Sequence, residues 1–188
     1  MITVLFTQKY SIYEKLNCDC YDINRDALSF KGTNSVIAHP PCRAWGKLKG
    51  VAKPRPGEKE LAIYALNVIR KNGGILEHPS SSDIFKFHGL PKPGSIDEFG
   101  GFVIHVNQHW FGHKAEKRTG LYIVGIEPRS IPDYTLNFNA VTHVVSTVSK
   151  MNGRKELSKK GREATPELLA KWLIELCNQI ECIKVNSR

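Results

Sequence analysis

The strongest constraint on the fold is a strand–helix–strand pattern. Two short apolar runs, at 35–39 and 74–78, each end at a proline. Between them, residues 58–71 carry apolar side chains at helical spacing, and a Gly-Gly pair ends this helix. A helix that connects consecutive strands of one sheet makes these strands parallel, with a right-handed crossover. The sequence therefore predicts an α/β fold in which both strands end at the same edge of the sheet.

Further elements are expected on both sides of this unit. Strands are predicted at 2–6, 18–23, 102–106 and 121–124, a short helix or turn at 11–16, and an exposed loop at 90–101. Thr165 has the character of an N-cap before a last helix, with Pro166 at its first position. A chain of 188 residues with 41% hydrophobic residues suits one domain. We expect a compact Rossmann-like domain over 1–188, with a mostly parallel sheet flanked by helices.

The proline-stiffened turn after the first of these strands carries Cys42 at the carboxyl edge of the sheet, where open α/β folds place their chemistry. Glu77 ends the parallel strand, so it is expected on the same side. A polar turn at 108–119 adds Lys117 and Arg118. A thiol beside basic groups has a lowered pKa and becomes a nucleophile. These four residues are the predicted catalytic set.

Such a set suits a pyrimidine ring as the electrophile. Addition of a thiolate at C6 makes C5 electron-rich, and Glu77 near ring N3 could protonate or orient the ring. Lys117 or Arg118 could steady a carbonyl oxygen or a phosphate. A base in a duplex must leave the stack to reach such a pocket. The sequence thus favours covalent chemistry on a pyrimidine.

A net charge of +9 indicates a partner that carries phosphate groups, and DNA or a pyrimidine nucleotide is the expected partner. The simpler interpretation is that the lysines only keep the protein soluble. Basic residues follow the cysteine turn and recur in 150–162, and on one face they would follow a DNA backbone. The segment 144–164 predicts a basic, mobile loop that orders on binding. The residues expected to contact DNA are Lys47, Lys49, Lys53, Arg55, Arg154 and Lys155.

Composition argues against several classes of protein. No apolar run approaches the roughly 20 residues of a membrane span. The N-terminal sequence lacks the features of a signal peptide, so we expect a cytoplasmic protein. Five cysteines, an odd number, favour free thiols. Histidines at 39, 78, 105, 109 and 113 leave open a metal-dependent hydrolase, but on strands and turns they need not share a face, and no metal site is predicted.

Three motifs resemble those of the DNA cytosine-C5 methyltransferase family. Pro-Pro-Cys-Arg-Ala-Trp-Gly at 40–46 is similar to the catalytic Pro-Cys loop, and Leu-Glu-His-Pro at 76–79 to the Glu-Asn-Val or Glu-Asn-Pro motif. The segment 111–125 resembles the arginine-bearing segment with its following strand. The motifs occur in family order within 35–125. The resemblance implies a methyltransferase-like fold, a short, divergent, phage-encoded member, and methyl transfer from S-adenosylmethionine to a pyrimidine in DNA.

The chain also departs from the family pattern. The cofactor loop of the family is glycine-rich, whereas here no glycine precedes Gly32, and the target-recognition region is missing. Asp22 stands where an acidic residue of the family holds the cofactor ribose, and Phe6 and Pro40 complete the expected cofactor contacts. The leading hypothesis is a DNA-modifying enzyme. The alternative is a degenerate relative that has lost the cofactor and acts as a DNA-binding or counter-defence protein.

Overall fold

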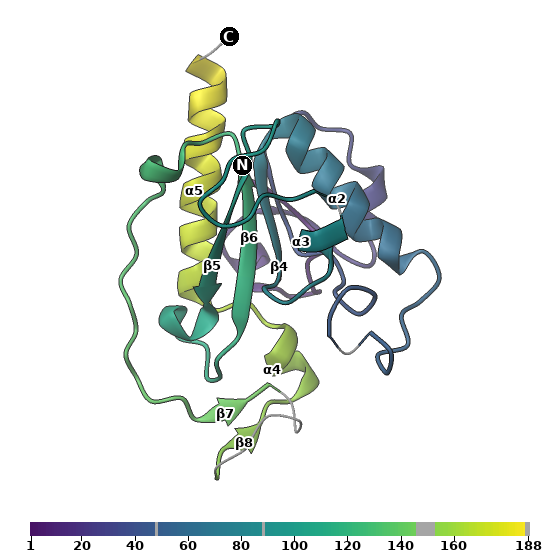
Figure 1. Cartoon of the computed structure of the whole chain (residues 1–188), viewed down its shortest axis with the longest axis vertical. Helices are drawn as coiled ribbons and strands as arrows, with labels where there is room; N and C mark the ends of the chain where they lie inside the picture. The colour runs from purple at the N-terminus through teal and green to yellow at the C-terminus, as the bar shows by residue number, and fades with distance from the viewer. Residues whose placement is uncertain (48, 88, 146–152, 187–188) are drawn as a thin grey trace.

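One six-stranded sheet with helices on both faces carries the fold of the computed structural model (Figure 1). The structure describes residues 1–47, 49–87, 89–145 and 153–186. The strands of the sheet are β1 (Thr3–Leu5), β2 (Asp19–Tyr21), β3 (Val36–Ala38), β4 (Gly74–Pro79), β5 (Phe102–Asn107) and β6 (Arg118–Val124). Their order is β2-β1-β3-β4-β6-β5. The predicted α/β class is confirmed.

The sheet reverses its order beside β1. β1 pairs in parallel with β2 on one side and with β3 on the other, and β3 pairs in parallel with β4. The predicted parallel strand–helix–strand unit is therefore present. β6 runs antiparallel to both β4 and β5, so the sheet is mixed. In open α/β sheets, ligands bind outside the carboxyl ends of strands at such a reversal, which here are the ends of β1 and β3.

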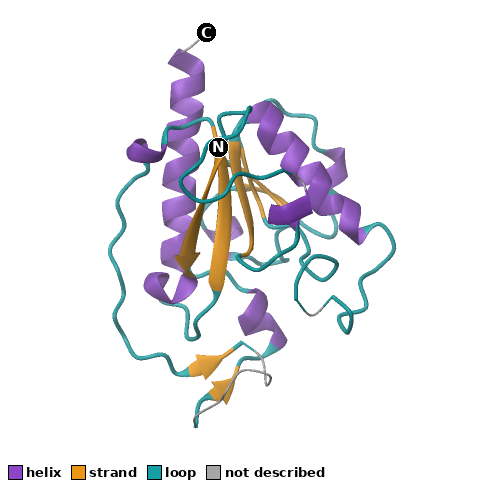
Figure 2. Ribbon diagram, viewed as in Figure 1, coloured by secondary structure: helices purple, strands orange, loops and turns teal. Residues whose placement is uncertain are grey.

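The helices form two layers, one on each face of the sheet (Figure 2). The α-helices are α1 (Ile12–Lys15), α2 (Glu58–Asn72), α3 (Ile84–Phe87), α4 (Lys159–Glu163) and α5 (Glu167–Asn186). Short 3-10 helices are η1 (Ala27–Ser29), η2 (Gln108–Phe111) and η3 (Pro128–Ser130). α2 ends as predicted, because the N–H of Gly73 bonds the carbonyl of Ile69 at 2.8 Å in a backbone conformation that favours glycine (φ 78°).

Alternation along the strands divides the core into two halves. Ile75 packs with α5 on one face, whereas Leu76 packs with α2 on the other. The C-terminal helix contributes Leu169, Leu173 and Leu176, all fully buried, to the first half. By the same alternation, Glu77 and His39 continue the α5 side of their strands. This parity decides which side chains can meet at the carboxyl edge.

A small second sheet and α4 lie beside the carboxyl edge of the main sheet (Figure 1). β7 (His143–Val144) pairs in parallel with β8 (Lys155–Glu156), and the N–H of Leu157 bonds the carbonyl of Val144 at 3.0 Å. Within the predicted loop 144–164, the described residues therefore include a strand and a helix, while 146–152 lie outside the described residues. Among the described helices, none combines the length and apolar character needed to cross a bilayer.

Most element boundaries lie within one or two residues of the prediction, and the starts of β6 and α5 need comment. β6 begins at Arg118, three residues before the predicted start, because the polar residues 118–120 pair with 105–107 of β5. Such pairing is non-local, so the local composition of a polar turn concealed it. α5 begins at Glu167, just after the predicted cap Thr165 and first position Pro166.

Candidate functional site

A nearly buried carboxylate, Glu77, lies at the carboxyl end of β4. Its Oε2 lies 3.1 Å from Nδ1 of His39, which follows β3. Its Oε1 accepts hydrogen bonds from Nε2 of Gln108 in η2 at 3.0 Å and from Oγ1 of Thr119 in β6 at 3.3 Å. The Glu77 side chain is 12% exposed. Donors from three separate segments thus converge on the Glu77 carboxylate, and a small part of this side chain remains exposed at the carboxyl edge of the sheet.

The surroundings keep Glu77 ionised. Burial alone would raise the pKa of Glu77, but the hydrogen bond from His39 and the positive charge of Lys117 outweigh it and lower this pKa to about 2. An ionised carboxylate accepts hydrogen bonds and has no proton to donate. Of the two roles expected from the sequence, orienting a ring therefore suits the resting state of Glu77 better than protonating it.

Cys42 lies on the turn after β3, and the residue as a whole is exposed although surrounding protein atoms partly desolvate its thiol. The amides of Trp45 and Gly46 bond its carbonyl at 3.0 and 2.8 Å, and the next residue, Arg43, holds the turn to α2 through Glu58 at 2.8 and 2.6 Å. These contacts present the thiol at the same edge as Glu77, as predicted. The sequence determined this juxtaposition through the parallel pairing of β3 and β4.

The protonation state of Cys42 differs from the expected one. Partial burial of the thiol and the negative charge of Glu77 raise the pKa of Cys42, and the positive charge of Lys117 opposes them. The expectation of a lowered pKa was wrong for the resting site, because desolvation and a nearby anion outweigh one lysine. Cys42 is therefore a neutral thiol at neutral pH.

Lys117 and Arg118 differ in their relation to Glu77 and Cys42. The charge of Lys117 lowers the pKa of both Glu77 and Cys42. Arg118 is exposed, and alternation along β6 places it on the face opposite Thr119, which contacts Glu77. Arg118 is thus a residue of β6 rather than of a turn, and its membership in the catalytic set stays a prediction.

The histidines do not form a metal centre. No group of three or more metal-ligating side chains gathers in the part of the chain that the structure describes. His78 is fully buried, and burial lowers its pKa to about 4. The ring nitrogens of His109 and His113 lie against backbone carbonyls. The surroundings of these three histidines are therefore burial for His78 and backbone carbonyls for His109 and His113, not a shared metal-ligand site.

The predicted cofactor residues surround the reversal point of the sheet. Phe6 directly follows β1 and has a left-handed backbone (φ 63°), a conformation that favours glycine. Asp22 follows β2, and its Oδ1 accepts from the amides of Asn24 and Arg25 at 2.8 and 3.0 Å, which lowers its pKa. Pro40 is buried after β3. Phe6 thus adopts, without being glycine, a backbone conformation that glycine commonly supplies.

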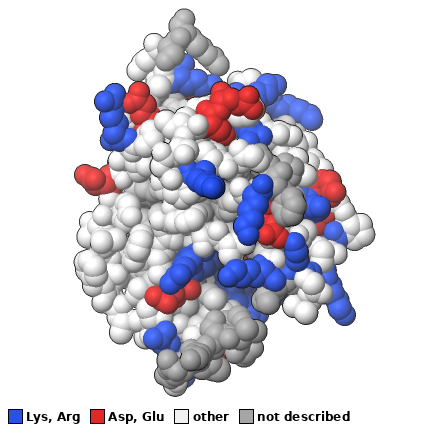
Figure 3. Space-filling view, in the orientation of Figure 1, with Lys and Arg blue, Asp and Glu red and all other residues white. Residues whose placement is uncertain are grey.

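Basic side chains form a band across the lower half of one face, over the region of α4 and the loop that precedes α2 (Figure 3). Of the predicted DNA contacts, Lys47, Lys53, Arg55 and Lys155 are exposed and Arg154 is half-buried. Lys49 forms an ion pair with Asp83. The basic residues of the loop before α2 and those around α4, which are distant in the sequence, thus both border the edge that carries Cys42.

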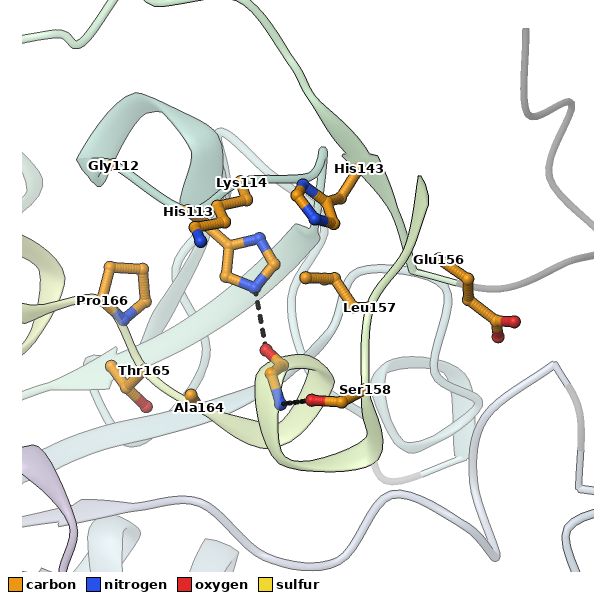
Figure 4. A pocket seen from close by; sticks show the side chains of 11 residues that line it. Gly112, His113, Lys114, His143, Glu156, Leu157, Ser158, Ala164, Thr165 and Pro166 are labelled. Carbon is orange, nitrogen blue, oxygen red and sulfur yellow. Dashed lines mark hydrogen bonds between the residues drawn. The ribbon is translucent and has the colours of Figure 1, made fainter. Parts of the chain in front are cut away.

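A separate pocket of ≈ 370 Å³ lies between η2 and α4 (Figure 4). His113 spans it toward the carbonyl of Gly161 at 3.3 Å, and Ser158 caps α4 by accepting from the amide of Gly161 at 3.1 Å. Neither Cys42 nor Glu77 belongs to its lining. The lining residues are Gly112, His113, Lys114, His143, Glu156, Leu157, Ser158, Gly161, Ala164, Thr165 and Pro166.

Sequence reasoning missed Gln108 and Thr119 and considered His39 only as a metal ligand. Thr119 could have been found from parity, because it lies two residues before the apolar Leu121 and so shares its face. No sequence pattern indicated Gln108, since the 3-10 turn that aims it toward Glu77 depends on tertiary contacts.

No protein-family model, curated protein sequence or solved structure matches this chain.

Proposed function

We propose that this chain is a DNA-modifying enzyme of the cytosine-C5 methyltransferase type, in which Cys42 attacks a pyrimidine. The observation that carries the proposal is the placement of Cys42 and an ionised Glu77 at the carboxyl ends of the paired strands β3 and β4, where the charge of Lys117 acts on both. Buried carboxylates held by several donors mark sites where charge is used. The order and spacing of the motifs around Cys42 and Glu77 support the same assignment.

The proposed chemistry assigns one step to each side chain. Cys42 loses its proton to solvent, and its sulfur bonds C6 of the pyrimidine, so that the electrons of the C5–C6 double bond make C5 nucleophilic. Glu77 orients the ring by accepting a hydrogen bond from the exocyclic amino group of cytosine, and Lys117 offsets the charge that develops. After transfer, C5 loses its hydrogen to a base, the double bond re-forms and the C6–sulfur bond breaks. S-adenosylmethionine, when bound, supplies the methyl group.

The residues at the ends of β1 and β3 fit that cofactor. The hydroxyl of Thr7 is buried there with the Cys20 thiol beside it and without an oxygen or nitrogen partner among the described residues, which leaves it able to bind a polar ligand. Asp22 is ionised and has an oxygen that the turn amides leave to a ribose hydroxyl. Phe6 and Pro40 would provide apolar contacts. A site of this kind belongs at the reversal point of the sheet.

DNA is the partner that the charge distribution favours. The basic band borders the edge that carries Cys42, where it could hold phosphates on both sides of an extruded base (Figure 3). Such binding weakens steeply as the salt concentration rises. A DNA-modifying enzyme of this type would act in the cytoplasm.

A covalent trap tests the proposal directly. The substrate is a duplex pool in which 5-fluoro-deoxycytidine replaces every deoxycytidine, so that all sequence contexts are present. We expect an adduct that survives denaturing electrophoresis in the presence of S-adenosylmethionine, because a C5 that carries fluorine and methyl has no hydrogen to lose. The adduct should vanish in Cys42→Ser, whereas Cys182→Ser, which changes another exposed cysteine, should form it normally.

Each failure of the trap has a defined meaning. An adduct that persists in Cys42→Ser would contradict the assigned nucleophile. If the wild-type protein forms no adduct with cytosine or uracil analogues and S-adenosylmethionine does not raise its Tm, the proposal fails. Salt-dependent duplex binding that survives Cys42→Ala would then support the cofactor-less DNA-binding alternative, which the raised pKa of Cys42 favours.

The neutral thiol predicts the pH dependence of the trap. The pKa of Cys42 is raised above its ordinary value of 9.0, so below about pH 9 the thiolate fraction grows about tenfold per pH unit. We expect the single-turnover rate of adduct formation to rise in the same proportion between about pH 6.5 and 8.5. A rate that is flat over this interval would show that the thiolate is already formed, contrary to the structure.

A further inference from the structure

A hydrogen-bonded chain connects Glu77 to the interior of the protein. The hydroxyl of Tyr13 lies 2.8 Å from Nε2 of His39, and Nδ1 of His39 lies 3.1 Å from Oε2 of Glu77. The Tyr13 and His39 rings also pack against each other, with centroids 5.3 Å apart. Three polar side chains, from α1, from the position directly after β3 and from β4, thus form one continuous unit.

The chain has a defined direction. An ionised Glu77 requires a donor, so Nδ1 of His39 carries hydrogen and donates to it. In a neutral ring, Nε2 then accepts the hydrogen of Tyr13. Tyr13 is 2% exposed, and burial holds its pKa well above the ordinary value, so its hydroxyl keeps this hydrogen. Tyr13 therefore selects the ring tautomer that faces Glu77 with a donor.

The charged and titratable groups around the chain come from every element that packs on it. Glu77 is influenced by Lys117 and by His78, and Tyr13 by Cys18, Cys20 and the hydroxyl of Thr165. Both thiols have raised pKa values because of burial and are neutral. The positive charge of Lys117 therefore offsets the anion at Glu77, His39 donates a hydrogen bond to it, and His78 is neutral at pH 7.

We propose that His39 is a positioning residue for Glu77 and that Tyr13 is a positioning residue for His39, so that the three present one oriented carboxylate to the pyrimidine ring. The geometry requires this order, because Oε1 of Glu77 is held by Gln108 and Thr119 and Oε2 by His39. With Oε2 released, the carboxylate would rotate about the remaining contacts. The orientation of a pyrimidine ring rests on the proposed function, whereas the hydrogen-bonded chain from Tyr13 through His39 to Glu77 does not.

Two amide variants of His39 form a matched pair for the test. In His39→Asn the side-chain N–H₂ replaces Nδ1 and can still donate to Glu77, whereas in His39→Gln it replaces Nε2 and faces Tyr13. Both side chains are polar and smaller than or similar in size to histidine, so both variants are expected to fold. The Glu77 carboxyl ¹³C signal, assigned by its loss in Glu77→Gln, reports the protonation of Glu77 without any activity.

We expect Glu77 to stay ionised down to about pH 3 in the wild-type protein and in His39→Asn. In His39→Gln the pKa of Glu77 should rise by at least about one unit, a tenfold change in proton affinity, because the largest of the lowering contacts is lost. Tyr13→Phe should produce a smaller rise, because the ring keeps its place but loses its tautomer preference. Identical titrations of Glu77 in His39→Asn and His39→Gln would overturn the role of His39, and a wild-type titration in Tyr13→Phe would overturn that of Tyr13.

The covalent trap supplies an independent second readout. His39→Gln should form the adduct about 100-fold more slowly, as expected for a misplaced orienting group, and His39→Asn should restore most of the rate. If the wild-type protein forms no adduct, the proposed function fails, but the titration of Glu77 still decides the positioning role.

Discussion

Glu77→Gln is expected to lower the free energy of unfolding at pH 7 by about 3 kcal/mol, the value of a carboxyl pKa that is depressed from 4.5 to about 2. Glutamine keeps the shape of the side chain but loses the charge that His39 and Lys117 stabilise. Its amide also brings a donor toward Gln108, which donates to the same position in the wild-type protein. Urea unfolding followed by circular dichroism measures the difference.

The same variant should change the acid stability. The pKa of Glu77 is lower in the folded protein than in the unfolded chain, so its contribution is complete above about pH 5 and disappears as the pH falls toward 2. The difference in unfolding free energy between the wild-type protein and Glu77→Gln should therefore shrink by about 2 kcal/mol between pH 7 and pH 3. Other carboxyl groups titrate in both proteins and cancel.

Glu127→Gln is the matched control, because Glu127 is exposed and its carboxylate pairs with the equally exposed Arg129. It should change the free energy of unfolding by less than about 0.5 kcal/mol at pH 7. A difference between wild type and Glu77→Gln that stays constant from pH 7 to pH 3 would contradict the ionised state of Glu77. Loss of the covalent adduct in Glu77→Gln, with the fold retained, would support its orienting role.

Gly74→Ala is expected to destabilise the fold by about 4 kcal/mol or more, from backbone strain and overpacking together. Gly74 begins β4 with φ 131°, and a Cβ there would lie 2.1 Å from the carbonyl oxygen of Val36 and 2.8 Å from its nitrogen. Both atoms belong to the backbone of β3, so relief requires the two strands to separate. Thermal and urea unfolding should both show the loss.

A change that disturbs the pairing of β3 with β4 should also disrupt the candidate site at the carboxyl ends of these strands. Gly74 is the register partner of Val36, and this pairing places Cys42 beside Glu77. Gly74→Ala should therefore abolish the covalent trap even at a temperature at which the variant remains folded. Gly50→Ala is the control, because nothing lies within 4 Å of a Cβ at that position. It should leave stability and adduct formation unchanged, and a Gly74→Ala protein with normal adduct formation would refute the register argument.

The elements that repeat local patterns could be predicted from the sequence. The helix at 58–72 carries its apolar spacing and its glycine stop within itself, and the two prolines mark the ends of β3 and β4. The start of β6 could not be predicted, because residues 118–120 are polar and acquire strand structure only by pairing with β5. That error of three residues placed Arg118 in a turn beside Lys117 and concealed the contact of Thr119 with Glu77.

The chemical state of the site required the three-dimensional arrangement. A lysine near Cys42 predicted a lowered thiol pKa, but desolvation and the charge of Glu77 reverse the sign. Likewise, no sequence pattern indicates that Gln108, Thr119 and His39 converge on one carboxylate. Hydrogen bonds and desolvation act over a few ångströms between segments that are distant in the chain, so their balance is set by packing.

The sequence by itself determined the α/β class and the shared edge of Cys42 and Glu77, because periodicity, proline stops and the handedness of crossovers are local or topological properties. Only the tertiary structure decided that the charge of Lys117 influences both groups, that Arg118 lies on the strand face opposite Thr119, that Glu77 is held as an anion and that Cys42 is a neutral thiol. The physical reason is that side-chain parity and electrostatic balance depend on which strands pair and on what each pairing buries.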